Sequence, residues 1–105
     1  MDNKPRTGLH EKKTGYIYSI RSPHTEKYYI GSTYQALHKR FYEHKNGYLK
    51  NGPCTSKEIL KYGDAYIEVM EIYEDCNRYL LSKREHELIR QHKDEVVNLK
   101  GSKKP

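Results

Sequence analysis

A chain of 105 residues has room for one domain with a single modest core and excludes a multidomain protein. Its hydrophobic content is 34%, and no apolar run approaches the about 20 residues of a membrane helix, so we expect no membrane partner. The 20 lysines and arginines exceed the 14 acidic residues, and this net charge of +6 favours a polyanionic partner.

The aromatic and sulfur-containing residues indicate the character of the interior and the cellular compartment. The chain has 11 tyrosines, one phenylalanine and no tryptophan, which favours an interior that borders a wet cleft, because tyrosine keeps a polar tip when its ring is buried. Cys54 and Cys76 lack the spacing of a metal site or redox pair. With no apolar signal core at the N-terminus, we expect reduced thiols and a cytoplasmic or nuclear protein.

The polar segment 1–13 is predicted to be a loose arm, and residues 101–105 a basic tail, on either side of a domain over 14–100. That domain should begin with a β-hairpin. Its two strands, 14–21 and 27–32, are rich in tyrosine and isoleucine, and a five-residue turn joins them. The hairpin would bring Tyr18 and Tyr29 within reach of one sheet face, subject to register.

Residues 35–48 predict a helix with one apolar stripe. At about 100° per residue, Leu37, Phe41 and Tyr48 fall on that stripe. His44 falls on the stripe as well and Arg40 at its edge, so both need polar partners there.

A capping box, Thr55 with Glu58, predicts a short helix to residue 62, which Gly63 would end in the left-handed conformation. Residues 66–73 are β-branched and aromatic, which predicts a third strand.

The last predicted helix covers 77–93, with Asp75 or Asn77 as its cap. Its inward stripe is formed by Leu81, Leu88 and Ile89. Glu85 falls in the middle of that stripe, whereas Glu87 faces water. A carboxylate among apolar residues is rare without a partner, so periodicity alone singles out Glu85.

Two phenols, a guanidinium, an imidazole and a carboxylate suit phosphodiester cleavage, which needs an activated water and a counter-charge in the transition state. Arg40 offers two parallel donors to phosphate oxygens, and Glu85 can anchor one Mg²⁺ that keeps several waters. A tyrosine serves as base only where cations and hydrogen bonds stabilise its phenolate. Seen singly, the strand tyrosines would be packing residues, and Arg40 with His44 ordinary helix polarity.

From residue 14 to about residue 99, the chain resembles the GIY-YIG nuclease superfamily. The first motif is Gly15-Tyr16-Ile17-Tyr18, in which Tyr16 stands where the motif glycine is expected. The second, Tyr29-Ile30-Gly31, is intact. The remaining family positions are matched by Arg40, His44, Glu85 and Asn98.

The resemblance implies an α+β fold, a three-stranded antiparallel sheet flanked by helices, and a Mg²⁺-dependent DNA endonuclease, in which Mn²⁺ could replace Mg²⁺. Tyr18 would take a proton from water, helped by Tyr29 and His44. Arg40 would hold the scissile phosphate, and Glu85 would carry the metal. The implied catalytic set is Tyr18, Tyr29, Arg40, His44, Glu85 and Asn98, with Glu85 as the metal ligand.

Homing, repair or structure-specific, and restriction-like roles stay open, as do a monomer and a weak dimer. The alternative is a catalytically silent nucleic-acid-binding module of the same fold, although a decayed site would be expected to lose Arg40 or Glu85. A structural or adaptor protein with a tyrosine core is a third interpretation, and it leaves the inward Glu85 unexplained.

Overall fold

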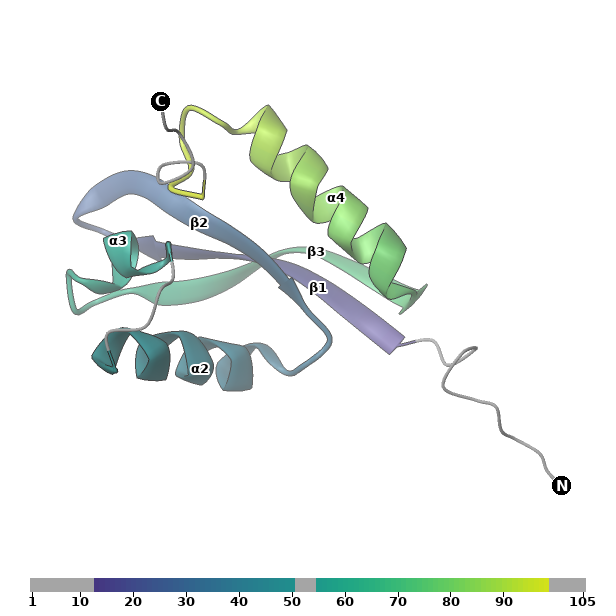
Figure 1. Ribbon diagram of the computed structural model, residues 1–105, viewed down its shortest axis with the longest axis horizontal. Coiled ribbons are helices and arrows are strands. Elements are labelled where there is room, and N and C mark those ends of the chain that lie inside the picture. The colour runs from purple at the N-terminus through teal and green to yellow at the C-terminus, as the bar shows by residue number, and fades with distance from the viewer. Residues whose placement is uncertain (1–12, 51–54, 99–105) are drawn as a thin grey trace, which may run out of the picture.

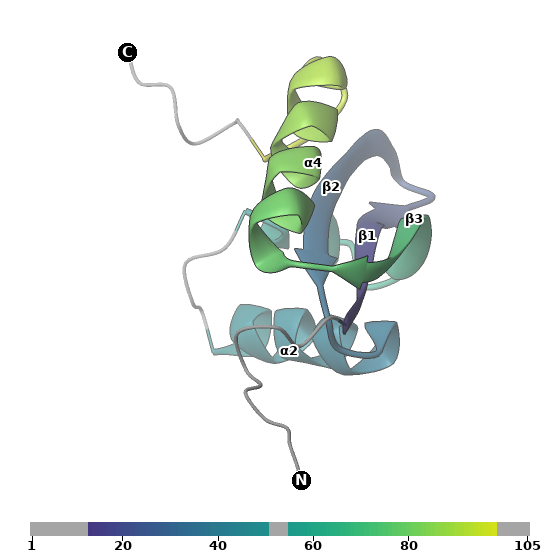
Figure 2. The same ribbon diagram turned by 90° about the vertical axis from the view of Figure 1, so that its right-hand side faces the viewer.

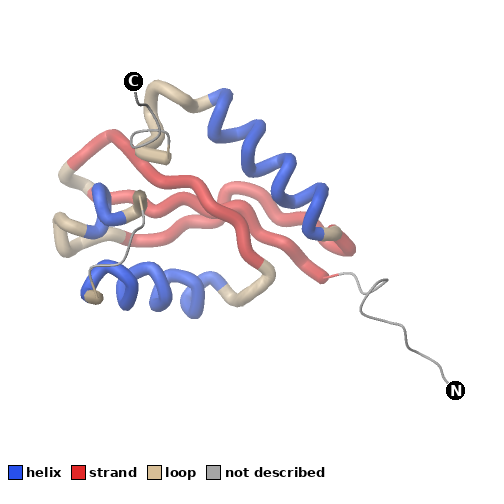
Figure 3. The backbone as a smooth tube through the Cα atoms, viewed as in Figure 1, coloured by secondary structure: helices blue, strands red, loops and turns tan. Residues whose placement is uncertain are grey.

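The computed structural model describes residues 13–50 and 55–98, and it forms one three-stranded antiparallel sheet with helices (Figure 1). The strands are β1 (Lys13–Ser22), β2 (Thr25–Thr33) and β3 (Tyr66–Cys76). The helices are α2 (Leu37–Leu49), α3 (Lys57–Leu60) and α4 (Arg78–Gln91). The strand order is β2-β1-β3, so β2 and β3 are the edges (Figure 3). The predicted α+β fold is confirmed.

The helices lie on opposite faces of the sheet, with α4 on one side and α2 on the other (Figure 2). One core cluster joins the sheet to α4 and includes Ile17, Ile30, Leu81, Leu88 and Ile89. The other joins the sheet to α3 and includes Tyr18, Ile20, Ile59 and Leu60. Because both faces are covered, successive residues of the central strand β1 are buried.

The turn between β1 and β2 is shorter than the predicted five residues. Ser22 still pairs with Thr25, which leaves a two-residue turn of Pro23 and His24. The Ser22 hydroxyl donates to Asp64 Oδ1 at 2.8 Å and accepts from the backbone N–H of His24 at 3.0 Å. These bonds fix the strand end, so the strands extend beyond the limits that composition predicted.

The capping box predicted for α3 is wrong. Ser56, not Thr55, takes the N-cap position, and no side-chain cap hydrogen bond forms there. The Ser56 hydroxyl contacts His44 instead. The helix ends at Leu60, earlier than the predicted residue 62, although Gly63 takes the predicted left-handed conformation, with a φ of 84°.

At the start of α4, the Asn77 side chain accepts the Leu80 N–H at 2.9 Å, so Asn77 is the cap. The preceding strand runs on to Cys76, beyond the predicted 66–73, and Asp75 lies within it with a φ of 55°. Cys76 is a buried free thiol, while Cys54 lies outside the described residues.

The C-terminal segment folds back along the free edge of β2. Val96 forms a parallel bridge with Tyr28, and the Val97 N–H donates to the Tyr28 carbonyl at 2.9 Å. Of the predicted arm and tail, only Lys13 lies within the described residues, and it begins β1. Within this part of the chain, no helix has the length and apolar character to span a membrane.

Candidate active site

The predicted site residues meet around Gly31 of the edge strand β2. Tyr18 of β1 pairs with Gly31, and its side chain is fully buried. A Cβ atom at position 31 would collide with the Tyr18 hydroxyl oxygen. Glycine is therefore required at this position because the phenol lies against the β2 backbone.

Among the described residues, the Tyr18 hydroxyl has two hydrogen-bond partners, and both come from α2. Its oxygen lies 2.8 Å from His44 Nε2, and Arg40 Nε donates to it at 3.2 Å. Arg40 and His44 are one helical turn apart, so a single face of α2 supplies both groups. The inward phase predicted for His44 is confirmed, since this residue is 6% exposed.

Tyr29 completes an aromatic cluster between the sheet and α2. Its ring centroid lies 6.4 Å from that of Tyr18 and 5.1 Å from that of His44. Tyr29 is half-buried, whereas Tyr18 is fully buried. The structure thus brings together the two tyrosines of the family motifs with the helical histidine and arginine.

Burial sets the charge states of this cluster. Burial and the nearby Arg40 lower the pKa of His44 to about 4, so its imidazole is neutral at pH 7. Burial, and to a smaller extent Tyr29, raises the pKa of Tyr18 above its ordinary value, although Arg40 opposes the rise. The phenol is therefore protonated in the free protein, and it can act as a base only if a neighbour takes its proton.

Arg40 lies beside Tyr18 and is partly open to solvent. Its side chain is 34% exposed, and its Nη1 donates to Glu43 Oε1 at 2.8 Å. Gln35 Nε2 donates to the other oxygen of Glu43 at 3.3 Å. Arg40 can thus approach a phosphate, but one of its terminal nitrogens already has an anionic partner.

Glu85 approaches β2 from the opposite side, on α4. It is half-buried, and one of its oxygens accepts a hydrogen bond from the hydroxyl of Ser32, the residue after Gly31. Its charge is among those that raise the pKa of Tyr18. Glu87 is exposed and pairs with Arg84 at 3.1 Å, which confirms the predicted phase of this helix.

The residues around Glu85 fit a hard cation that keeps most of its water. Mg²⁺ commonly takes one or two protein carboxylates, and Glu85 offers a partly exposed one that Ser32 orients. Within residues 13–50 and 55–98, no group of three or more His, Cys, Asp or Glu side chains is arranged to hold a metal. Glu85 with Ser32 is thus a pair of side chains that one hydrated divalent cation would fit.

Asn98 lies on the other flank of the site and bonds to the backbone of β2. Its Oδ1 accepts the Ile30 N–H at 2.9 Å, and its Nδ2 donates to the Ile30 carbonyl at 2.7 Å. Both ends of the Asn98 amide thus form hydrogen bonds, and they satisfy the backbone N–H and C=O of Ile30, the residue before Gly31 on the edge strand. Asn98 therefore holds β2 in place beside the site.

Three side chains of the site were not predicted from the sequence: Ser32, Glu43 and Ser56. Because successive residues of a strand point to opposite faces, strand alternation could have placed Ser32 on the face away from that of Gly31, towards α4. Helix spacing could have paired Glu43 with Arg40, because they are three residues apart. Ser56 gave no such signal, since the local pattern suggested a capping box.

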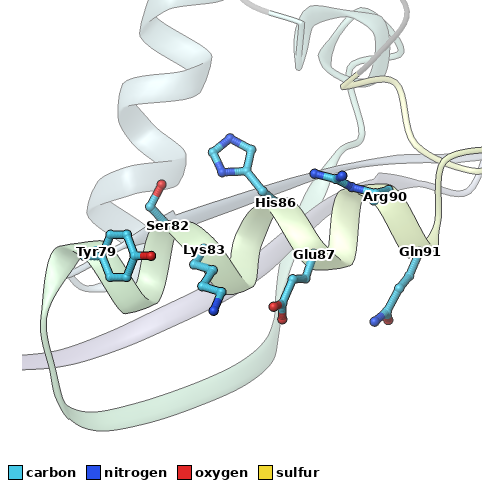
Figure 4. A pocket seen from close by; sticks show the side chains of 7 residues that line it. All are labelled: Tyr79, Ser82, Lys83, His86, Glu87, Arg90 and Gln91. Atoms are coloured by element: carbon cyan, nitrogen blue, oxygen red, sulfur yellow. The ribbon is translucent and has the colours of Figure 1, made fainter.

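A hollow lies along the outer face of α4 (Figure 4). The side chains along it all come from one helix: Tyr79, Ser82, Lys83, His86, Glu87, Arg90 and Gln91. Lys83 and Arg90 contribute to the basic surface that the net charge predicts. The hollow beside these side chains is lined by no other element, so we assign it no catalytic role.

Comparison with known proteins agrees with this geometry. A model of the GIY-YIG catalytic domain matches residues 14–99. The chain is 33% identical over 61 residues to "Uncharacterized protein 019R" of Invertebrate iridescent virus 6, which covers 57% of this chain and 22% of that protein. No solved structure gave a significant match.

Proposed function

Because the chain belongs to the GIY-YIG catalytic domain family, a family of nuclease domains, we propose that it is a Mg²⁺-dependent endonuclease that hydrolyses phosphodiester bonds in DNA. The observation that carries the proposal is the convergence of Tyr18, Arg40 and Glu85 around Gly31 from three separate elements. A phenol, a guanidinium and a carboxylate lie at one edge of the sheet in this way, and we propose that they act as base, phosphate-binding cation and metal ligand.

Tyr18 is proposed to activate the attacking water. Its proton passes to His44 Nε2, 2.8 Å away, and the phenolate that remains is stabilised by the N–H of Arg40. The phenolate then takes a proton from water while the water oxygen forms a bond to phosphorus and the bond to the leaving oxygen breaks. The leaving oxygen then receives a proton from solvent, and His44 returns its extra proton to solvent, so the starting state of the site is restored and every proton is accounted for.

Arg40 is proposed to bind the scissile phosphate as well. A guanidinium donates through several N–H groups at once, so its terminal nitrogens can bind phosphate oxygens while Nε stays on Tyr18. Binding of this kind stabilises the extra negative charge of the transition state more than that of the bound substrate.

Glu85, oriented by Ser32, is the residue that would hold Mg²⁺. The ion would supply Lewis-acid stabilisation of the leaving oxygen. The positive net charge would attract DNA to the protein. One such site cuts one strand at a time, so nicked DNA should be the first product.

The test is incubation of the protein with supercoiled plasmid and with branched DNA, in Mg²⁺ and then in EDTA, beside the Tyr18→Phe variant. We expect nicking in Mg²⁺ alone and by the wild type alone. DNA binding without cleavage under all conditions would instead indicate the silent binding module. Neither binding nor cleavage would indicate an adaptor, and both outcomes would overturn the proposal.

A further inference from the structure

Ser56 is a buried serine whose hydroxyl is directed at the active site rather than at its own helix. It is the N-cap residue of α3, and it is 0% exposed. An N-cap serine ordinarily accepts a backbone N–H of its helix, yet no such side-chain bond forms here. Ser56 Oγ lies 2.8 Å from His44 Nδ1 instead.

The hydrogen-bond chain around His44 determines which nitrogen carries the proton. Arg40 can only donate, so the Tyr18 oxygen accepts from it. Within the described chain, the hydroxyl proton of Tyr18 then has a single acceptor, His44 Nε2. In a neutral imidazole the other nitrogen must be the donor, so His44 Nδ1–H donates to Ser56 Oγ.

We propose that Ser56 is a positioning residue of the hydrolysis reaction, which acts by accepting the Nδ1 proton of His44 and so keeping Nε2 free for the proton of Tyr18. The inference rests on the proposed function for its catalytic consequence. The tautomer that it assigns to His44 does not depend on that function.

Ser56 also acts after the proton has moved. When the Tyr18 O–H bond breaks and the His44 Nε2–H bond forms, the buried imidazolium carries two protons and needs two acceptors. The phenolate of Tyr18 accepts one and the Ser56 oxygen the other. Burial and Arg40 disfavour this cation, while Glu43 favours it, and Tyr29 packs against the ring.

The tautomer can be measured without DNA or metal, by long-range proton–nitrogen NMR of the His44 ring at pH 7. We expect the shift of an unprotonated nitrogen at Nε2 and of a protonated one at Nδ1. In Ser56→Ala, the proton should be shared between the two nitrogens. A protonated Nε2 in the wild type would overturn the inference, whether or not the protein cleaves DNA.

The catalytic consequence is measured by single-turnover cleavage as a function of pH. Ser56→Ala should be slower by about 10–100-fold, the usual cost of removing a group that orients a functional histidine. Loss of the acceptor also makes the His44 cation less stable, so the acid limb of the rate profile should move to lower pH. A change in folding alone would leave that limb in place.

Two variants control the comparison. Ser56→Thr keeps the hydroxyl and should restore most of the rate, and Thr55→Ala removes a neighbouring exposed hydroxyl without effect. If the wild type cleaves DNA while Ser56→Ala matches its rate and its acid limb, the inference fails and the proposed function stands. If the wild type does not cleave, the proposed function fails, and the NMR experiment alone decides the tautomer.

Discussion

The polar side chains that lie on the two sides of strand β2 differ in burial and in the partners that they bond. On the α2 face, Tyr18 is 0% exposed and His44 is 6% exposed, and each bonds to a protein partner. On the α4 face, Glu85 is half-buried with Ser32 as its hydrogen-bond donor. Buried polar groups need fixed partners, whereas a partly exposed carboxylate can take a ligand from solution. Under the proposed function, the first face would be preorganised for proton transfer and the second would be open to a cation.

The largest effect should come from Glu85→Gln, which keeps the shape of the side chain but removes its charge. We expect metal-dependent cleavage to be abolished, because the carboxylate is the proposed anchor of Mg²⁺. The free energy of unfolding should change little, because the glutamine side-chain oxygen can still accept the hydrogen bond of the Ser32 hydroxyl. Glu87→Gln, on the outer face of the same helix, is the control and should cleave normally. Cleavage assays and urea titrations of both variants measure these outcomes.

Tyr18→Phe should affect both activity and stability, unlike Glu85→Gln. The cleavage rate should fall by about 10²–10⁴-fold, the usual contribution of general acid–base catalysis. The free energy of unfolding should fall by about 1–3 kcal/mol, because the variant leaves buried His44 without its hydroxyl partner. An unchanged stability would contradict the view that this face is a closed network.

On both faces, the sequence predicts some of the polar residues and misses others. Helix periodicity placed His44 and Glu85 on inward stripes, since it reports which side of an element faces the protein. It does not report which element lies opposite. Asn98 pairs with Ile30 across 68 positions, and Ser56 with His44 across 12, and neither contact leaves a local pattern.

Two local predictions, the capping box of α3 and the length of the hairpin turn, were wrong because contacts with distant residues changed the local structure. The run from Thr55 to Glu58 has the composition of a capping box, but the hydroxyl of Ser56 is used by His44 from another helix. The hairpin turn was predicted too long because Asp64, far along the chain, bonds to Ser22 and extends the strand. Tertiary contacts override local preference in both places.

The buried histidine predicts how stability should depend on pH. The pKa of His44 is about 4 in the folded protein and about 6.5 in an unfolded chain. Below pH of about 6.5 the unfolded state therefore binds a proton that the folded state excludes, so stability falls as pH decreases through this range. His44 accounts for a loss of up to about 3 kcal/mol in the free energy of unfolding. The loss is complete once the pH is below the pKa of His44 in the folded protein.

His44→Gln isolates this contribution. Its free energy of unfolding should decrease less between pH 7 and pH 4 than that of the wild type. Paired carboxylates such as Glu71 with Arg84 also lose stability in acid, but they do so in both proteins. The control is His38→Gln, an exposed histidine of the same helix, which should follow the wild-type curve. Parallel curves for wild type and His44→Gln would contradict a buried neutral imidazole.

The smallest expected effect concerns Arg40 and tests whether its guanidinium is also available to a ligand from solution. Glu43→Gln removes the anion that pairs with Arg40 Nη1 at 2.8 Å, so DNA should bind more tightly. An exposed ion pair is worth up to about 1 kcal/mol, which limits the gain to about fivefold. Glu87→Gln is a matched control: the Glu87 side chain is as exposed as that of Glu43, at 47%, and it pairs with an arginine three residues away, on the outer face of α4. Fluorescence anisotropy at fixed salt without metal would measure both. Equal gains would show that only net charge matters, whereas a gain confined to Glu43→Gln would show that Glu43 competes with the phosphate for Arg40.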